Sequence, residues 1–264
     1  MRWLIALWGI LVREALRFVG QRERLASALV RPLLWLVIFA SGFRAALGVA
    51  ITPPYQTYIT YEVYILPGLI AMVQLFSGMQ TSLSMVYDRE TGAMRALLVS
   101  PLPRWWLLFA KLLAGALVSL VQVYAFLAAA WAFGVTVPAA GYVAVAPVLL
   151  LSGLMLGAAG LFLSSAIRQL ENFAGVMNFV IFPAFFLSSA LYPLWKIAES
   201  NPLLAGLAGW NPFTWAVEAI RFALYLDADW PSLAGLAAAL LVFAGLAVWG
   251  YDPARGLLRR KVTD

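Results

Sequence analysis

The amino-acid sequence predicts an all-α, polytopic membrane protein with six transmembrane helices. Of its 264 residues, 64% are hydrophobic and only 11% are charged, whereas a soluble domain carries about 25% charged residues. A globular core cannot bury so much apolar surface, and the bilayer is the alternative solvent. The apolar stretches also recur at spanning length, since each reaches the roughly 20 residues that a helix needs to cross the hydrocarbon core.

Residues 1–28 form an arginine-rich arm that is predicted to be an amphipathic helix on the membrane surface. At about 100° per residue, its arginines Arg2, Arg13, Arg17 and Arg24 project within one sector. Apolar side chains occupy the opposite arc, which is the pattern of an interfacial helix; these are Trp3, Leu7, Ile10, Leu11 and Phe18. Because arginines interrupt the apolar stretch and no small-residue cleavage site follows, a cleavable signal peptide is not expected.

Six apolar stretches are then predicted to span the membrane, at 30–49, 63–87, 106–133, 142–167, 173–192 and 232–251. The first is the weakest, because Arg44 lies within it. Fifteen of the 18 lysines and arginines fall in the segments assigned to one side, and only Arg44, Lys196 and Arg221 fall on the other. By the positive-inside rule both termini are therefore cytoplasmic, and we expect a multi-pass protein of the bacterial inner membrane.

The composition also restricts the chemistry that the chain can perform. Cysteine and histidine are both absent, which removes thiolate and imidazole metal ligands, cysteine nucleophiles and the commonest general base. We therefore expect no catalytic residue, no metal site and no cofactor. The net charge of +6 is spread between the apolar runs, so it indicates membrane topology and no nucleic acid partner.

The most informative interruption of the apolar pattern is the cytoplasmic loop at 88–105. Asp88 and Glu90 are expected near the start of a short helix, where acids complement the helix dipole. Pro101 stops that helix, and Trp105 marks re-entry at the headgroup level. Such a helix suits docking to a soluble partner, and an ordinary positively charged loop fits the pattern equally well.

The same segment resembles the ABC type-2 transporter permease family. Members carry an E-[RK]-E-x-G-[ST]-like element followed by L-x-x-[ST]-P, and this chain has DRETG at 88–92 and LVSP at 98–101. Aspartate in place of the first glutamate keeps the charge. The resemblance extends more loosely over the whole chain, 1–264, as one permease domain. Within the family, the chain is most similar to permeases associated with pyrroloquinoline-quinone-dependent alcohol oxidation.

The resemblance implies a permease of an ATP-binding-cassette exporter whose coupling helix, at about 90–100, enters a cleft on a cytoplasmic ATP-binding subunit. It implies a second permease copy, as a homodimer among membrane lipids. The sequence holds no G-x-x-x-x-G-K-[ST] phosphate loop, so nucleotide would be bound by the partner. The residues it assigns to coupling are Asp88, Arg89, Glu90, Gly92, Met94, Arg95, Leu98, Ser100 and Pro101.

A second informative stretch, 193–231, is long for a turn and rich in aromatic residues. Asn201–Pro202 and Asn211–Pro212 mark turns, and we expect two short re-entrant or interfacial helices on the outer side. Glu218 and Arg221 are three residues apart and able to pair. The aromatic residues either anchor the segment at the outer headgroups or form a gate that releases an amphipathic substrate.

Polar and small residues inside the spans allow two interpretations. Gln74, Gln80 and Asn178 could line a translocation path, although such residues more often mediate helix packing. Glycines at 153, 157 and 160 indicate a close helix approach in the fourth span.

Two other function classes remain as alternatives. An ion-coupled secondary transporter normally needs intramembrane carboxylates or histidines, and the central portions of the six predicted spans hold no Asp or Glu. A membrane enzyme acting on lipid-linked substrates needs clustered acid–base groups. The carboxylates Glu199, Glu218, Asp227 and Asp229 could supply them, but their spacing matches no known motif.

Overall fold

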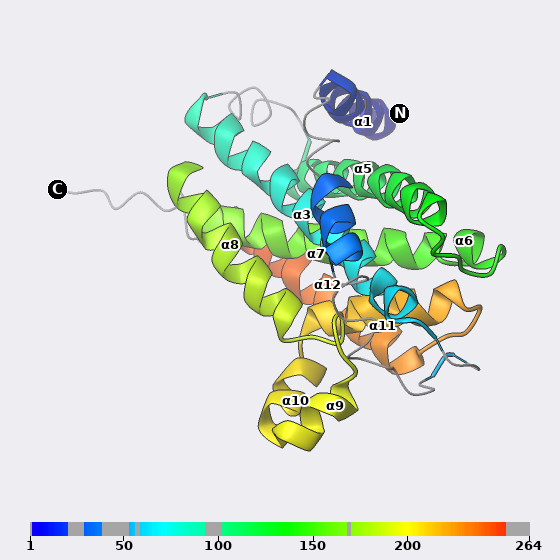
Figure 1. Cartoon of the computed structure of the whole chain (residues 1–264). Coiled ribbons are helices and arrows are strands. Elements are labelled where there is room, and N and C mark those ends of the chain that lie inside the picture. Colours follow the sequence, from blue (N-terminus) through cyan, green and yellow to red (C-terminus); the bar gives the residue numbers. More distant parts are fainter. Residues whose placement is uncertain are drawn as a thin grey trace.

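The computed structural model describes residues 2–20, 29–38, 53–55, 59–92, 102–167 and 170–251, and these are built from α-helices (Figure 1). In chain order the helices are α1 (Arg2–Gly20), a helix at Leu29–Ile38, α3 (Tyr61–Glu90), α5 (Arg104–Ala132), α6 (Gly141–Ala144), α7 (Ala146–Ala166), α8 (Leu170–Phe186), α9 (Leu194–Ser200), α10 (Pro202–Gly209), α11 (Pro212–Leu224) and α12 (Trp230–Gly250).

Four helical segments among the described residues are long and apolar enough to cross a membrane: α3, α5, Gly141–Ala166 and α12. They agree with the spans predicted at 63–87, 106–133, 142–167 and 232–251. The two other predicted spans stay predictions. Of 30–49 the structure describes only part, in the helix Leu29–Ile38, and α8 has 17 residues.

The centre of the bundle is α3, which is buried along nearly its whole length. Its sequence is apolar on all sides, and a helix of that kind needs neighbours on every face. α5, α7, α8 and α11 supply them, and α12 packs on the far side of α7 (Figure 1).

Glycines allow α3 and α7 to approach each other closely, as the sequence indicated for the fourth span. A Cβ atom added to Gly78 would lie 3.0 Å from the Cα of Gly157, and one added to Gly160 would lie 2.5 Å from the hydroxyl of Ser82. Small residues allow such close approach of two helix backbones. In lipid, where the hydrophobic effect does not drive helix association, the resulting van der Waals packing contributes to it.

The segment after α8 contains three short helices, α9, α10 and α11, where the sequence predicted two. Both predicted turns occur, because Asn201 and Asn211 are the N-cap residues of α10 and α11 and each is followed by proline at the first helical position. The amide of Asn211 also donates to the carbonyls of Ala184 and Leu187, which fixes α11 against the end of α8.

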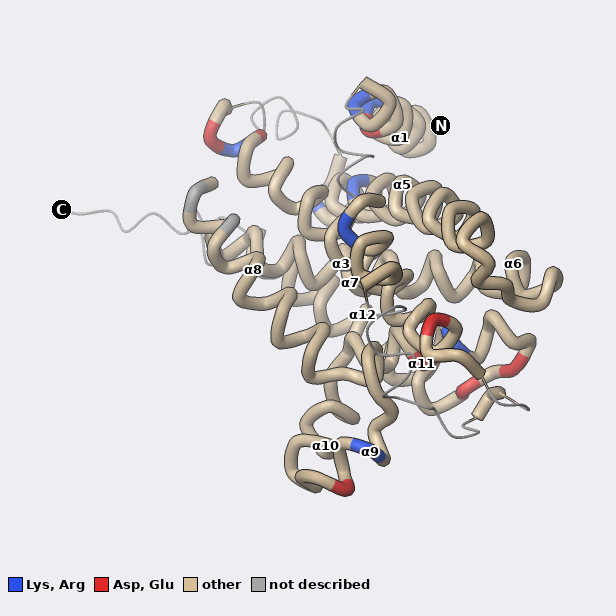
Figure 2. The backbone as a smooth tube through the Cα atoms, in the orientation of Figure 1, with Lys and Arg blue, Asp and Glu red and all other residues tan. Residues whose placement is uncertain are grey.

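The bundle has two ends, which we call the α1 end and the α10 end after the helices found there. Figure 1 shows α1 nearly end-on beside the start of α5, while α5 and α7 run across the view, so α1 crosses the bundle. The charged residues that the structure describes gather mainly at these two ends (Figure 2). This distribution is typical of a protein whose middle zone faces lipid.

Candidate functional site

The last three residues of α3, Asp88, Arg89 and Glu90, lie at the α1 end and connect α3 to several other helices. We call these residues the α3 triplet. They are consecutive on a helix, so their side chains point in different directions, about 100° apart. Each therefore reaches a different set of neighbours.

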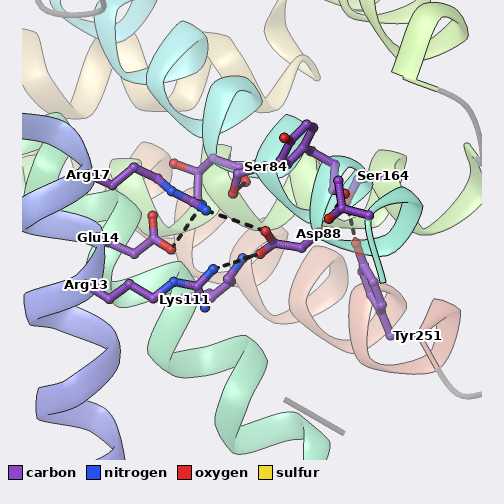
Figure 3. Close-up of polar contacts among 11 residues, drawn as sticks. Arg13, Glu14, Arg17, Ser84, Asp88, Lys111, Ser164 and Tyr251 are labelled. Atoms are coloured by element: carbon purple, nitrogen blue, oxygen red, sulfur yellow. Dashed lines mark hydrogen bonds and ion pairs between the residues drawn. The ribbon is translucent and has the colours of Figure 1, made fainter. Parts of the chain in front are cut away.

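Asp88 binds cations from two helices (Figure 3). The Nζ of Lys111 on α5 lies 2.7 Å from its Oδ2. From α1, Arg13 approaches Oδ2 to 3.4 Å and Arg17 approaches Oδ1 to 3.6 Å. The side chains of Asp88 and Lys111 are only 2% and 4% exposed, so this pair is a buried ion pair, and Asp88 is not a surface charge free to contact a partner.

The second member of the triplet, Arg89, holds the ends of α7 and α12. Its guanidinium donates to the carbonyls of Ser164 and Ile167, both at 3.1 Å. Those carbonyls belong to the last turn of α7, where backbone acceptors lack partners in the helix itself. Arg89 also lies over the ring of Tyr251, which follows α12, and the hydroxyl of Tyr251 bonds that of Ser164 at 2.8 Å.

Glu90 reaches the beginning of α8. One of its carboxylate oxygens accepts a hydrogen bond of 2.8 Å from the backbone N–H of Leu170, the first residue of that helix. A carboxylate at this position satisfies a free N–H and complements the helix dipole. Together the α3 triplet therefore connects α3 to α1, α5, α7, α8 and α12.

α3 ends directly after the triplet. The N–H of Thr91 bonds the carbonyl of Tyr87, and Gly92 adopts a left-handed backbone with φ of 75°. Asp88 and Glu90 thus end a long helix, which corrects the expectation that they begin a short one. Acids near a helix start complement the dipole, but here their partners Lys111 and Leu170 hold them at a helix end. Of the other predicted coupling residues, Met94, Arg95, Leu98, Ser100 and Pro101 lie outside the described residues.

The helix α1 is fixed to the bundle at a second place, the start of α5. The ring of Trp3 lies 5.7 Å from that of Trp105 and 5.2 Å from that of Trp106, whose indole N–H donates to the carbonyl of Trp3. Arg13 and Arg17 face the bundle, and an apolar stripe faces outward, made of Leu4, Ile5, Trp8, Leu16 and Val19. This stripe differs from the predicted apolar arc, because Trp3 packs on α5 and Leu7, Ile10, Leu11 and Phe18 are only partly exposed. The arginine side is directed to Asp88.

The three residues considered for a translocation path occupy different environments. Gln74 is fully buried between α3 and α7, where its amide donates to the carbonyl of Leu149 and accepts from the hydroxyl of Ser152, both at 2.6 Å. It therefore serves helix packing. Gln80 is partly exposed, and Asn178 is exposed on α8.

Sequence reasoning missed two positions. Lys111 was counted only as one of the charges that set topology, yet it is the nearest partner of Asp88. Arg31 was counted in the N-terminal arm, yet it lies in the helix Leu29–Ile38 with its guanidinium 3.9 Å from the ring of Phe76, midway along α3. The available signal was position, since both cations lie within predicted spans: Arg31 is the second residue of 30–49 and Lys111 the sixth residue of 106–133.

At the α10 end, the predicted pair of Glu218 and Arg221 is present on α11. The described residues contain no group of three or more carboxylates that could hold a metal ion.

Taken together, the polar groups at the two ends hold helices together by charge and hydrogen bonds. The α3 triplet is the candidate functional site, because it directly precedes residues 93–101 and contacts most of the bundle.

A protein-family model described as "ABC-2 type transporter" matches residues 5–225. Among similar proteins, the putative transport permease ycf38 of Cyanophora paradoxa is 27% identical over 209 residues, which cover 78% of this chain and 69% of that protein. The ycf38 protein of Porphyra purpurea is also 27% identical, over 211 residues with the same coverage. The probable multidrug ABC transporter permease YbhR of Escherichia coli K12 is 34% identical over 163 residues, 60% of this chain and 42% of that protein.

Proposed function

The chain belongs to the ABC-2 type transporter family, and from that premise we propose that it is the transmembrane permease subunit of an ATP-driven exporter. The observation that carries the mechanism is the α3 triplet. Its three side chains connect one helix end to α1, α5, α7, α8 and α12. A displacement of that helix end would move these contacts together.

We further propose that residues 93–101, which follow the triplet directly, contact a separate ATP-binding subunit on the cytoplasmic side. Movement of that subunit during ATP hydrolysis would then pass through Gly92 and Glu90 into the bundle. Buried ion pairs suit this role because their geometry is well defined, whereas exposed pairs rearrange at little cost. The cytoplasmic position of the α1 end rests on the distribution of Lys and Arg.

The translocation path is proposed to form between two copies of the chain. Asn178 and Gln80 are at least partly exposed on a single copy, and polar groups within a membrane zone usually face a partner or an aqueous path. One relative is named a probable multidrug permease, and we propose small amphipathic organic molecules as the cargo.

The coupling proposal is tested by co-expressing the chain with a candidate ATP-binding subunit and measuring ATP hydrolysis of the reconstituted complex. Glu90→Ala removes the acceptor for the N–H of Leu170. Gly92→Pro removes the N–H that bonds the carbonyl of Arg89 and imposes a negative φ. Both are expected to uncouple hydrolysis from transport without loss of membrane insertion.

Glu90→Gln is the matched control, since the amide keeps an oxygen that can accept from Leu170. It should retain most of the coupling. Normal coupling in both Glu90→Ala and Gly92→Pro would refute the assignment of this segment, and failure to bind any ATPase subunit would refute the permease proposal as a whole.

A further inference from the structure

A cavity of about 410 Å³ lies at the α10 end, between α9, α11 and the start of α12. Its volume falls within the roughly 300–1,000 Å³ that small-molecule sites occupy. Much of its wall is aromatic, from Tyr64, Trp195, Trp215 and Phe222. The α3 triplet lies at the opposite end of the bundle (Figure 1), so this cavity is separate from the coupling region.

One side of the cavity is a neutralised ion pair. Arg221 is fully buried, donates to a carboxylate oxygen of Glu218 and to the carbonyl of Ser189, and lies 4.3 Å from the ring of Tyr64. Burial alone would lower the pKa of the Arg221 guanidinium, but the charge of Glu218 outweighs burial and raises it above the ordinary value. The two charges therefore cancel, and the pair adds no net charge to the cavity.

Asp229 is different, because its carboxylate has no ion-pair partner among the described residues. It occupies the N-cap position of α12 but makes no capping hydrogen bond through its side chain. Within the described part of the chain it has no ion pair, and it lines the cavity while partly exposed. The charged residues that line the cavity, Glu218, Arg221 and Asp229, thus leave one negative charge unbalanced.

The aromatic residues that line the cavity include two tryptophans, Trp195 and Trp215. The ring of Trp215 packs closely against α12 at Gly235. A Cβ atom added to Gly235 would lie 2.7 Å from that ring, so only a glycine leaves room for the indole there. The ammonium of Lys196, which does not line the cavity, lies 5.9 Å from the ring of Trp195. A tryptophan at the rim therefore already accepts a positive charge within the distance typical of cation–π contacts.

We propose that this cavity binds a lipophilic organic cation, with its charge near Asp229 and its apolar groups against Trp195, Trp215 and Phe222. The carboxylate of Asp229 and the aromatic side chains together favour a cation, and the cavity volume suits a small molecule. Binding does not depend on the proposed transport function. The further statement that this cation is the exported cargo does rest on the proposed transport function.

The test uses two probes of nearly equal size and shape but opposite charge, tetraphenylphosphonium and tetraphenylborate. Purified permease without its ATPase is reconstituted in nanodiscs of neutral lipid, and each probe is titrated by isothermal calorimetry. Tetraphenylphosphonium should bind saturably. Asp229→Asn should weaken it by about tenfold, equivalent to about 1.4 kcal/mol, and Trp215→Ala by a similar factor.

Asp227→Asn is the matched control, because Asp227 lies on the same turn but does not line this cavity. It should leave the affinity unchanged, and an unchanged unfolding midpoint of Asp229→Asn excludes a folding defect. Equal binding of the two probes, or an affinity of Asp229→Asn within twofold of the parent, would overturn the proposal. Since no ATPase is present, loss of binding and loss of ATP coupling are separate results.

Discussion

Replacing Asp88 by asparagine tests the α3 triplet most severely, because one carboxylate serves three cations. The substitution keeps the size of the side chain and removes its charge. Lys111 then keeps a 4% exposed ammonium without an ion-pair partner among the described residues, and Arg13 and Arg17 lose their ion pairs with α3.

The magnitude follows from the exposure of each pair. Breaking a buried ion pair by removing one partner costs about 3–5 kcal/mol, mainly because the remaining charge stays buried. Arg13 and Arg17 are 41% and 27% exposed, and pairs of this kind contribute about 0–1 kcal/mol each. The Lys111 contact therefore dominates, and we expect Asp88→Asn to lower the unfolding free energy by about 3–5 kcal/mol.

The assay is reversible unfolding in mixed micelles by titration with dodecyl sulfate, followed by the fluorescence of the 11 tryptophans. Glu199→Gln is the control, since Glu199 is an exposed carboxylate on α9. The double variant Asp88→Asn with Lys111→Met removes both members of the buried pair and should recover at least half of the loss. A loss for Asp88→Asn no larger than that for Glu199→Gln would refute the reasoning, as would a double variant no more stable than Asp88→Asn alone.

Two glycines give further predictions. Gly92→Val should lower the unfolding free energy by about 1–2 kcal/mol because φ is positive there, whereas Gly92→Asn should be tolerated; a valine variant as stable as the asparagine variant would show that the left-handed turn is not required. Gly78→Ala should cost about 1–3 kcal/mol, because the new methyl group meets the backbone of Gly157. Gly245→Ala is its control in open space, and equal stability of the two alanine variants would contradict the close packing of α3 on α7.

The sequence predicted the four long spans and both asparagine turns, because these depend on local signals. Apolar length is enough to indicate a span, and an Asn–Pro pair specifies a helix start through its own side chain and ring. The close contact of the fourth span was also predictable, since glycine has few other uses in a helix within lipid.

The partners of charged residues could not be predicted in this way. Asp88 and Lys111 are 23 residues apart, and Glu90 and Leu170 are 80 apart. No periodicity connects positions on different helices, so the acids after the second span looked like the start of a new helix. For Gln74 the sequence favoured packing over a translocation path without naming a partner, and its contacts with Leu149 and Ser152 supply the partners.

The central claim, that the segment after α3 meets an ATP-binding subunit, is tested most directly by site-specific cross-linking. The chain has no cysteine, so single cysteines can be placed without background. Met94→Cys lies in the proposed contact segment, and Leu203→Cys, at an 80% exposed position on α10, serves as the control at the opposite end. With a thiol-to-amine cross-linker in membranes, Met94→Cys should yield an adduct with the ATPase subunit and Leu203→Cys none. An adduct from Leu203→Cys, or none from Met94→Cys in a complex that hydrolyses ATP, would contradict the claim.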